Sequence, residues 1–191
     1  MEKGDTIWSK TKLYHHFLCQ IIMWKLELLK IQYRILVLVS NKKRFEAMKE
    51  IDIEKTCKIL DNIMKYELAG VVRYTHSSMM VSGPYRIPIV EFLQAQANES
   101  LVHAQEAGEL LSGLEGHPSQ KIADIEETHQ HSIKDILEES LEHELHALSL
   151  YNDLLEEVEN KSVFLEEFAR NKIGQEEQHS LELKKMLKDY S

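Results

Sequence analysis

The sequence has few of the residues that interrupt helices, since its 191 residues include only seven glycines and three prolines. Leu, Glu, Lys, Ala and Ile dominate instead, and most of these residues favour helices. The composition therefore predicts an all-α fold. The chain is long enough to bury a hydrophobic core, and its length suits one domain or one domain with an appendage.

Cysteine is also scarce. The two cysteines, Cys19 and Cys57, lie in different segments and form neither a CxxC motif nor a spacing typical of zinc ligands. This pattern indicates neither a disulfide framework nor a thiolate metal site. We therefore expect a cytoplasmic protein whose thiols stay reduced.

Long uncharged apolar runs are missing as well. Residues 13–39 are rich in apolar side chains, but charged residues interrupt them repeatedly. The longest run there without Lys, Arg, Asp or Glu, residues 13–24, is too short to span a bilayer, which takes about 20 residues. No small-residue cleavage site follows this run, which leaves a signal peptide with little support.

Charge of the two signs is unevenly distributed along the chain, whose formal net charge is −9. Residues 1–46 hold nine Lys and Arg against four Asp and Glu, whereas the remaining residues hold 14 against 28. The acidic body is a poor partner for nucleic acid and suits cations instead. Much of this acidity is expected on solvated helix surfaces.

The basic N-terminal segment, residues 1–47, differs from the rest and is predicted to be a separate extension of a body at 48–191. Three interpretations stay open for it. It is an amphipathic helix that lies on a membrane or a partner, a disordered extension, or a translated upstream region outside the natural protein, because Met48 can itself serve as a start. Any membrane contact is expected only through this segment.

Apolar residues recur with helical spacing in four segments after Met48. These segments are residues 52–80, 88–114, 119–158 and 162–188. The first two breaks between them contain glycine and proline, which end helices. The third segment is longer than a usual globular helix, so we expect a bend or a short leading helix before Ser132.

A pattern of carboxylates, tyrosines and imidazoles occurs twice, about 77 residues apart. The first copy comprises Glu67, Tyr74, Glu99 and His103, and the second comprises Glu144, Tyr151, Glu176 and His179. Residues three or four apart share one face of a helix, so each Glu/His pair projects together. A bundle with one Glu from each of two helices and a Glu/His pair from each of two others encloses six ligands, as in di-iron carboxylate proteins.

Each of these residues alone has a simpler explanation, such as a hydrogen-bonded core histidine or a surface acid. A carboxylate inside a core, however, must be paired, protonated or bound to metal. Carboxylates and imidazoles without thiolates suit iron or manganese. We also expect that, in the absence of metal, the mutual repulsion and burial of these acids raise several of their pKa values.

The motifs resemble those of bacterioferritins and related ferritin-like proteins over residues 48–188. The resemblance is carried by Tyr66-Glu67-Leu68 with Tyr74, His103-Ala104, Leu114-Glu115-Gly116-His117-Pro118, Ser140-Leu141 before Glu144-Leu145, and Glu176-Glu177-Gln178-His179. It implies a ferritin-like four-helix bundle. It also implies that Glu67 and Glu144 are terminal ligands, that Glu99 and Glu176 bridge two metal ions, and that His103 and His179 each give one nitrogen. Tyr74 and Tyr151 are expected to support the ligands.

The chain departs from the family on its second helix. Bacterioferritins carry Glu-x-x-His there with a haem-ligating Met after the Glu, whereas this chain has Ser100 and Leu101 at those positions. Haem is therefore not expected. Glu99, four residues before His103, is the favoured substitute for the bridging carboxylate, and Glu106 is its rival.

The resemblance implies a ferroxidase in iron homeostasis that binds two iron ions per chain, or manganese, and uses O2 or H2O2. Bacterioferritins continue into a short fifth helix, whereas this sequence stops at Ser191, which speaks against a storage shell but not against a homodimer or larger homo-oligomer. Two alternatives stay open. One is a rubrerythrin-like peroxide reductase or another di-iron oxidase without storage, and the other is a metal-free helical interaction module.

Four further histidines lie on the third segment, namely His129, His131, His143 and His146. His143 flanks Glu144 and is a candidate for an added ligand or for a hydrogen-bond donor behind the ligands. A solvated polar face on an acidic helix is the favoured interpretation for all four.

Overall fold

The computed structural model of the chain describes residues 23–34, 36 and 51–190. Within these residues the regular secondary structure is entirely helical, which confirms the predicted all-α fold. The chain divides into two units at residues 49 and 50, and each is described here by itself.

The described part of the N-terminal unit, residues 23–34 and 36, is helical. Its large apolar side chains face solvent, among them Trp24 and Tyr33, and an exposed ion pair of 2.8 Å joins Lys30 to Glu27. Met48 and Cys19 lie outside the described residues, so the three interpretations of residues 1–47 stay predictions. Across the described residues, every helix falls short of the length or apolar character that crossing a bilayer requires.

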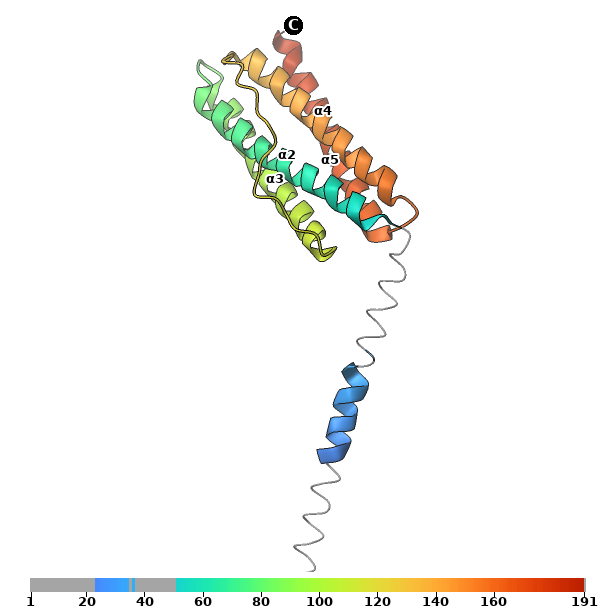
Figure 1. Cartoon of the computed structure of the whole chain (residues 1–191). Helices are drawn as coiled ribbons and strands as arrows, with labels where there is room; N and C mark the ends of the chain where they lie inside the picture. Colours follow the sequence, from blue (N-terminus) through green and yellow to red (C-terminus); the bar gives the residue numbers. More distant parts are fainter. Residues whose placement is uncertain (1–22, 35, 37–50, 191) are drawn as a thin grey trace, which may run out of the picture. The chain divides into compact units, whose positions relative to one another are not determined.

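The second unit is a bundle of four long helices, shown in Figure 1. They are α2 (Ile53–Met80), α3 (Arg86–Gly113), α4 (Ile133–Val158) and α5 (Val163–Leu187), and a short 3₁₀ turn, η1 (Lys188–Tyr190), follows α5. α2 and α3 pack as one hairpin, α4 and α5 pack as another, and α2 lies against α4. The segments predicted at 52–80, 88–114 and 162–188 and the ferritin-like bundle are thereby confirmed, whereas the segment predicted at 119–158 is helical only from Ile133.

Side-chain caps define where three of these helices begin. Asp52, Ser132 and Ser162 accept hydrogen bonds of 3.0, 3.2 and 3.5 Å from backbone N–H groups three residues later. Such caps satisfy N–H groups that have no partner inside the helix. They fix the register of α2, α4 and α5, and with it the depth at which their buried acids lie.

The connection between α3 and α4, residues 114–132, contains no helix, so the predicted leading helix before Ser132 is wrong. Because α3 and α4 begin at the same end of the bundle, this connection must run back along its length (Figure 1). Residues 114–132 would cover only about 28 Å as a helix, against about 42 Å for α3, whereas an extended chain covers the distance. The N–H groups of Ser119 and Ala123 anchor it on α2 by bonding the Asp61 carboxylate at 2.8 Å and the Lys65 carbonyl at 3.0 Å.

The core of the bundle combines apolar and charged residues. Fully buried leucines from every helix fill it, including Leu60, Leu93, Leu137, Leu154 and Leu183. Halfway along the helices, ionisable side chains that are only 2–3% exposed replace them: Glu67, His103, His143, Glu144 and Glu176. Charges buried this deeply require partners, so these side chains must pair with one another or with a bound ion.

Candidate metal centre

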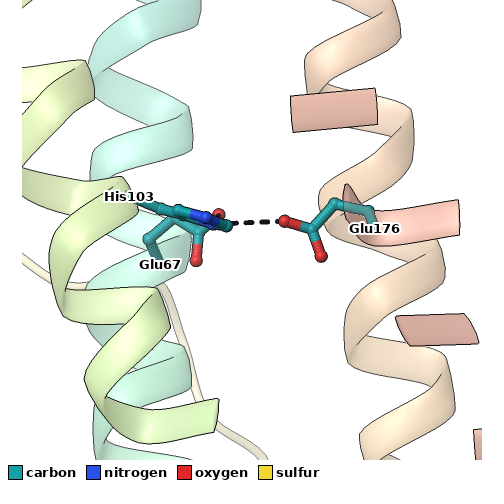
Figure 2. A group of neighbouring side chains, drawn as sticks. All are labelled: Glu67, His103 and Glu176. Carbon is teal, nitrogen blue, oxygen red and sulfur yellow. Dashed lines mark ion pairs between the residues drawn. The ribbon is translucent and has the colours of Figure 1, made fainter. Parts of the chain in front are cut away.

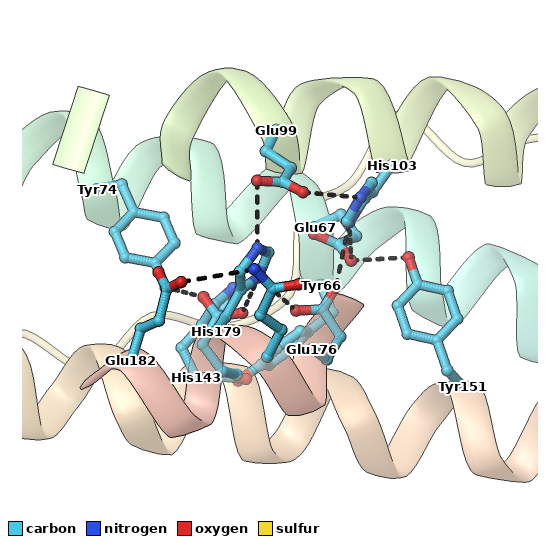
Figure 3. Close-up of polar contacts among 12 residues, drawn as sticks. Tyr66, Glu67, Tyr74, Glu99, His103, His143, Tyr151, Glu176, His179 and Glu182 are labelled. Carbon is cyan, nitrogen blue, oxygen red and sulfur yellow. Dashed lines mark hydrogen bonds and ion pairs between the residues drawn. The ribbon is translucent and has the colours of Figure 1, made fainter. Parts of the chain in front are cut away.

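All six predicted ligands line one small cavity inside the bundle. Figure 3 labels Glu67, Glu99, His103, Glu176 and His179 among them. α2 contributes Glu67, α3 contributes Glu99 and His103, α4 contributes Glu144, and α5 contributes Glu176 and His179. The rest of the lining consists of Gln96, Ser100, His143 and Ala147. The repeat in the sequence thus corresponds to one site to which both hairpins contribute.

The first group of donor atoms surrounds the His103 imidazole. Its Nδ1 lies 3.4 Å from Oε1 of Glu67 and 3.2 Å from Oε1 of Glu176. Figure 2 shows these three side chains directed toward one another. One donor atom from each of these three residues lies within 4.8 Å of the other two. The group is therefore compact enough to surround one metal ion.

The second group surrounds His179. Its Nδ1 lies 3.3 Å from Oε2 of Glu144 and 3.2 Å from Oε2 of Glu176, and the three residues again meet within 4.8 Å. Glu176 is common to both groups and directs a different oxygen toward each imidazole. A carboxylate in this position suits a bridge between two ions.

Glu99 lies on the other side of both imidazoles. Its Oε1 is 3.7 Å from Nε2 of His103 and its Oε2 is 3.3 Å from Nε2 of His179, and its side chain is 32% exposed. Glu106 stays outside the cavity, where it pairs with Lys172 at 2.6 Å. Of the two rivals, the structure brings Glu99 to the site.

The two predicted tyrosines each hold a carboxylate of the opposite hairpin. The Tyr151 hydroxyl donates to Oε1 of Glu67 at 2.8 Å, and the Tyr74 hydroxyl donates to Oε1 of Glu144. Both tyrosines are buried, and burial raises the pKa of each well above its usual value. They therefore stay protonated and remain donors to the two carboxylates.

Protons on the histidines balance much of the negative charge in the metal-free site. Burial alone would lower the pKa of His103, but its hydrogen bonds to Glu176 and Glu67 outweigh burial and raise the pKa to about 9. Burial likewise opposes protonation of His179, yet its bonds to Glu144, Glu176 and Glu99 raise the pKa to about 12. Both imidazoles are therefore cationic at neutral pH.

The acids respond to these cations in different ways. Burial raises the pKa of Glu144, as expected from the sequence. The pKa of Glu99 is lowered instead, by its hydrogen bond with His179. In Glu176, bonds from His103 and His179 outweigh burial and hold the pKa at about 2. A raised pKa is therefore found for Glu144 but not for these two acids.

His143 differs most from its prediction, because it is only 3% exposed rather than solvated. Its ring stacks on Tyr66, with centroids 4.5 Å apart and planes at 11°, and meets the edge of Tyr74. Burial lowers the pKa of His143 to about 4, so the ring is neutral at pH 7. Its position one residue before Glu144 was the only signal in the sequence that linked it to the site. His129 and His146 are exposed, as predicted, and His131 is partly buried.

Lys172 is a buried residue that sequence reasoning did not single out. It is 6% exposed, lies one helical turn before Glu176, and carries its ammonium 5.9 Å from the centroid of the Phe168 ring. Its pairing with Glu106 joins α5 to α3 beside His103. The spacing of four residues from Glu176 places it on the face of α5 that enters the bundle.

The donor set fits a pair of divalent ions. Oxygen and imidazole donors without thiolates suit Fe(II) and Mn(II). The two groups share Glu176, and ions in such paired sites lie about 3.5–4 Å apart. Four carboxylates would balance the charge of two such ions once the histidine protons have left.

Comparisons with known proteins agree with this fold. The profile of the ferritin-like domain family matches residues 57–191. Among curated protein sequences, none matches this chain significantly. A ferritin-like, diiron-carboxylate protein from Bacillus anthracis is similar in structure, with a TM-score of 0.68 at 22% sequence identity over 71% of this chain and 97% of that chain.

Two further solved structures are similar. A dodecameric thioferritin from Bacteroides fragilis, which is related to bacterioferritin, has a TM-score of 0.70 at 19% identity over 78% of this chain and 94% of that chain. Rhodobacter capsulatus bacterioferritin, described with a metal-free dinuclear site and haem iron, has a TM-score of 0.61 at 22% identity, with coverage of 72% and 86%. At these identities the likeness concerns the fold.

Proposed function

The chain belongs to the ferritin-like domain family, and we propose that it is a non-haem di-iron protein that binds two Fe(II) ions per chain and oxidises them with O2 or H2O2. The observation that carries this proposal is the sharing of Glu176 between two compact donor groups, one around His103 and one around His179. A carboxylate that lies between two imidazoles is placed to bridge a pair of ions, as in di-iron carboxylate bundles.

The proposed ligand roles follow from the contacts in the metal-free site. His103 with Glu67 would hold one ion, His179 with Glu144 would hold the other, and Glu176 would bridge them. Both imidazoles direct Nδ1 toward these carboxylates, so Nδ1 is the atom that would bind metal. Each must lose its proton first, because only a neutral imidazole can bind through a free lone pair.

Glu99 has two roles open to it. Its carboxylate faces the Nε2 atoms, where it would accept hydrogen bonds from both imidazoles and keep Nδ1 deprotonated for metal. The bridging role implied by family resemblance would require its carboxylate to move to the Nδ1 side. We propose the first role, because it uses the contacts that are present.

Two bound Fe(II) ions supply two electrons together, which reduce O2 to H2O2 or H2O2 to two waters with uptake of two protons. The protein's own contribution would be to hold the ions side by side in a small cavity that is lined mostly by buried side chains. Tyr74 and Tyr151 keep the carboxylates of Glu144 and Glu67 oriented through their hydroxyl donors.

We further propose that residues 48–191 form the functional body, that it works in the cytoplasm as a homodimer or larger homo-oligomer, and that it takes no haem. Leu101, at the position of the family's haem-ligating Met, offers no donor atom. Mn(II) fits the same donors and is the alternative metal.

The proposal is tested by anaerobic titration with Fe(II) followed by rapid mixing with O2 or H2O2. We expect saturation at two Fe(II) per chain and a fast absorbance change on oxidation. Failure to bind metal would favour a metal-free interaction module. Binding with sustained peroxide consumption, given an external electron donor, would favour a peroxide reductase instead.

A further inference from the structure

On the Nδ1 side of the two imidazoles, α3 offers the metal centre no carboxylate. Glu99 directs its two oxygens to the outer Nε2 atoms of the imidazoles. The other residues of α3 that line the cavity are Gln96, which carries a neutral amide, and Ser100, which is 6% exposed and carries only a hydroxyl group. α5, by contrast, places the Glu176 carboxylate between the two Nδ1 atoms. The two hairpins are therefore unequal, despite their repeated sequence pattern.

The imidazole of His143 reaches into the space beside Ser100. A Cβ atom added to Gly70 would lie 2.6 Å from Nε2 of His143 and 2.9 Å from Oγ of Ser100. Both atoms therefore lie over the same backbone position of α2, although one comes from α4 and the other from α3. Any side chain at Gly70 would push the ring away, so this glycine makes room for it.

His143 lacks the hydrogen bonds that a buried imidazole normally makes. It is 3% exposed, and neither Nδ1 nor Nε2 has a hydrogen-bond partner in the structure. Leaving such a group unpaired is unfavourable, so a buried polar atom of this kind usually has a partner. The ring lines the same cavity as the six predicted ligands, so an ion bound in that cavity would be available as the partner.

Contacts with two tyrosines fix the position of the ring. Tyr66 stacks on it and donates its hydroxyl to the His143 carbonyl at 3.4 Å, and Tyr74, which also holds Glu144, meets it edge-on. His143 is therefore held in place while its nitrogen atoms have no other bond. Both properties are needed in a preorganised ligand.

We propose that His143 supplies an additional nitrogen donor to the paired-metal centre, in place of the inner carboxylate that α3 lacks at Ser100. The proposal rests on the proposed function, because it needs ions in the cavity. A third imidazole adds no negative charge and shifts the donor set from oxygen toward nitrogen. Nitrogen-rich sites favour Co(II) and Fe(II) over Mn(II) more strongly than all-oxygen sites do.

Co(II) titration of the full chain tests this role, because the visible absorption of Co(II) depends on its donor atoms and needs no turnover. We compare the parent with His143→Ala and with His146→Ala. His146 is a matched control, since it lies on the same helix and its ring packs on the same Tyr66, but it is exposed and does not line the cavity. We expect His143→Ala to weaken the binding of at least one Co(II) about 10–100-fold and to change the spectrum, and His146→Ala to match the parent.

Two further variants separate ligation from folding. Gly70→Ala alters no donor atom but displaces the His143 ring, so it should reproduce the spectral change of His143→Ala. Ser100→Glu combined with His143→Ala restores an inner carboxylate and should recover the binding of two ions. Far-UV circular dichroism confirms that each variant is folded, and His143→Gln replaces His143→Ala if the latter is not.

The outcomes distinguish the two proposals. If the parent binds two Co(II) ions and folded His143→Ala keeps its affinity and spectrum, the role of His143 is overturned while the paired-metal proposal stands. If the parent itself binds fewer than two Co(II) ions, both are overturned.

Discussion

The Tyr151 hydroxyl on α4 donates a hydrogen bond of 2.8 Å to the Glu67 carboxylate on α2, across the two hairpins of the bundle. The equivalent residues, 77 positions away in the sequence repeat, form a second such pair, in which Tyr74 on α2 donates to Glu144 on α4. Each hairpin therefore supplies the tyrosine that orients the other hairpin's carboxylate. The two halves depend on each other for a complete site.

Removing one of these donors should weaken the site without removing a ligand. Tyr151→Phe deletes the hydroxyl and leaves the buried Glu67 carboxylate with one hydrogen bond fewer, which should lower the free energy of unfolding by about 1–3 kcal/mol. Urea denaturation of the metal-free protein measures this change. Tyr85→Phe is the control, because Tyr85 is 62% exposed. Equal stability of the two variants would contradict the role of Tyr151.

The raised pKa of His103 predicts how stability depends on pH. Its pKa is about 9 in the folded protein, against 6.5 for an unperturbed histidine such as that of the unfolded chain. The folded state therefore holds the proton more tightly. The resulting stabilisation is complete below pH 6.5 and is lost as the pH rises through about 9. The melting temperature of the protein without metal should therefore fall between pH 6.5 and pH 9. The melting temperature of the His103→Ala variant should fall less over the same range. A parallel decline in both proteins would speak against this assignment.

Metal binding should release protons for the same reason. At pH 7 both His103 and His179 carry protons that must leave before Nδ1 can bind an ion. Calorimetric titration with Mn(II) in two buffers of different ionisation enthalpy should reveal this release, and the affinity should rise with pH. Binding heats that do not depend on the buffer would show that the imidazoles are not ligands.

The position of Glu99 predicts a different outcome from that of a bridging acid. If Glu99 holds the imidazoles through Nε2, Glu99→Ala should weaken metal binding about 10–100-fold and still allow two ions to bind. If Glu99 instead bridges the two ions, Glu99→Ala should lose one ion of the pair. Glu106→Ala, which removes a partner of Lys172 outside the cavity, serves as the comparison, and the number of Co(II) ions at saturation decides between the roles.

The sequence predicted the helices and the six clustered residues because both depend on periodic patterns. Helical spacing and capping residues such as Ser162 are local, and the repeat of Glu67 and Glu144 links one hairpin to the other. The connection before Ser132 was predicted wrongly, because its conformation is set by the distance that it must span rather than by its own residues.

Side-chain environments were predicted less well. Whether His143 faces solvent depends on the missing Cβ of Gly70, 73 positions away in the sequence, and no periodic pattern marks that contact. The pKa values of Glu99 and Glu176 depend on which imidazole nitrogen each acid meets. Such contacts follow from the packing of the helices and cannot be read from spacing along one of them.

The central claim, that two ions share Glu176, is tested most directly by anaerobic Fe(II) titration of the parent beside Glu176→Ala and His179→Ala. The parent should bind two Fe(II) per chain and oxidise them rapidly on addition of O2 or peroxide. Both variants should lose the rapid phase, and Glu176→Ala should retain less metal, because it removes a charge that both ions use whereas His179→Ala removes one neutral donor from one ion. Saturation of the parent at one ion, or rapid oxidation that survives Glu176→Ala, would contradict the paired-metal account.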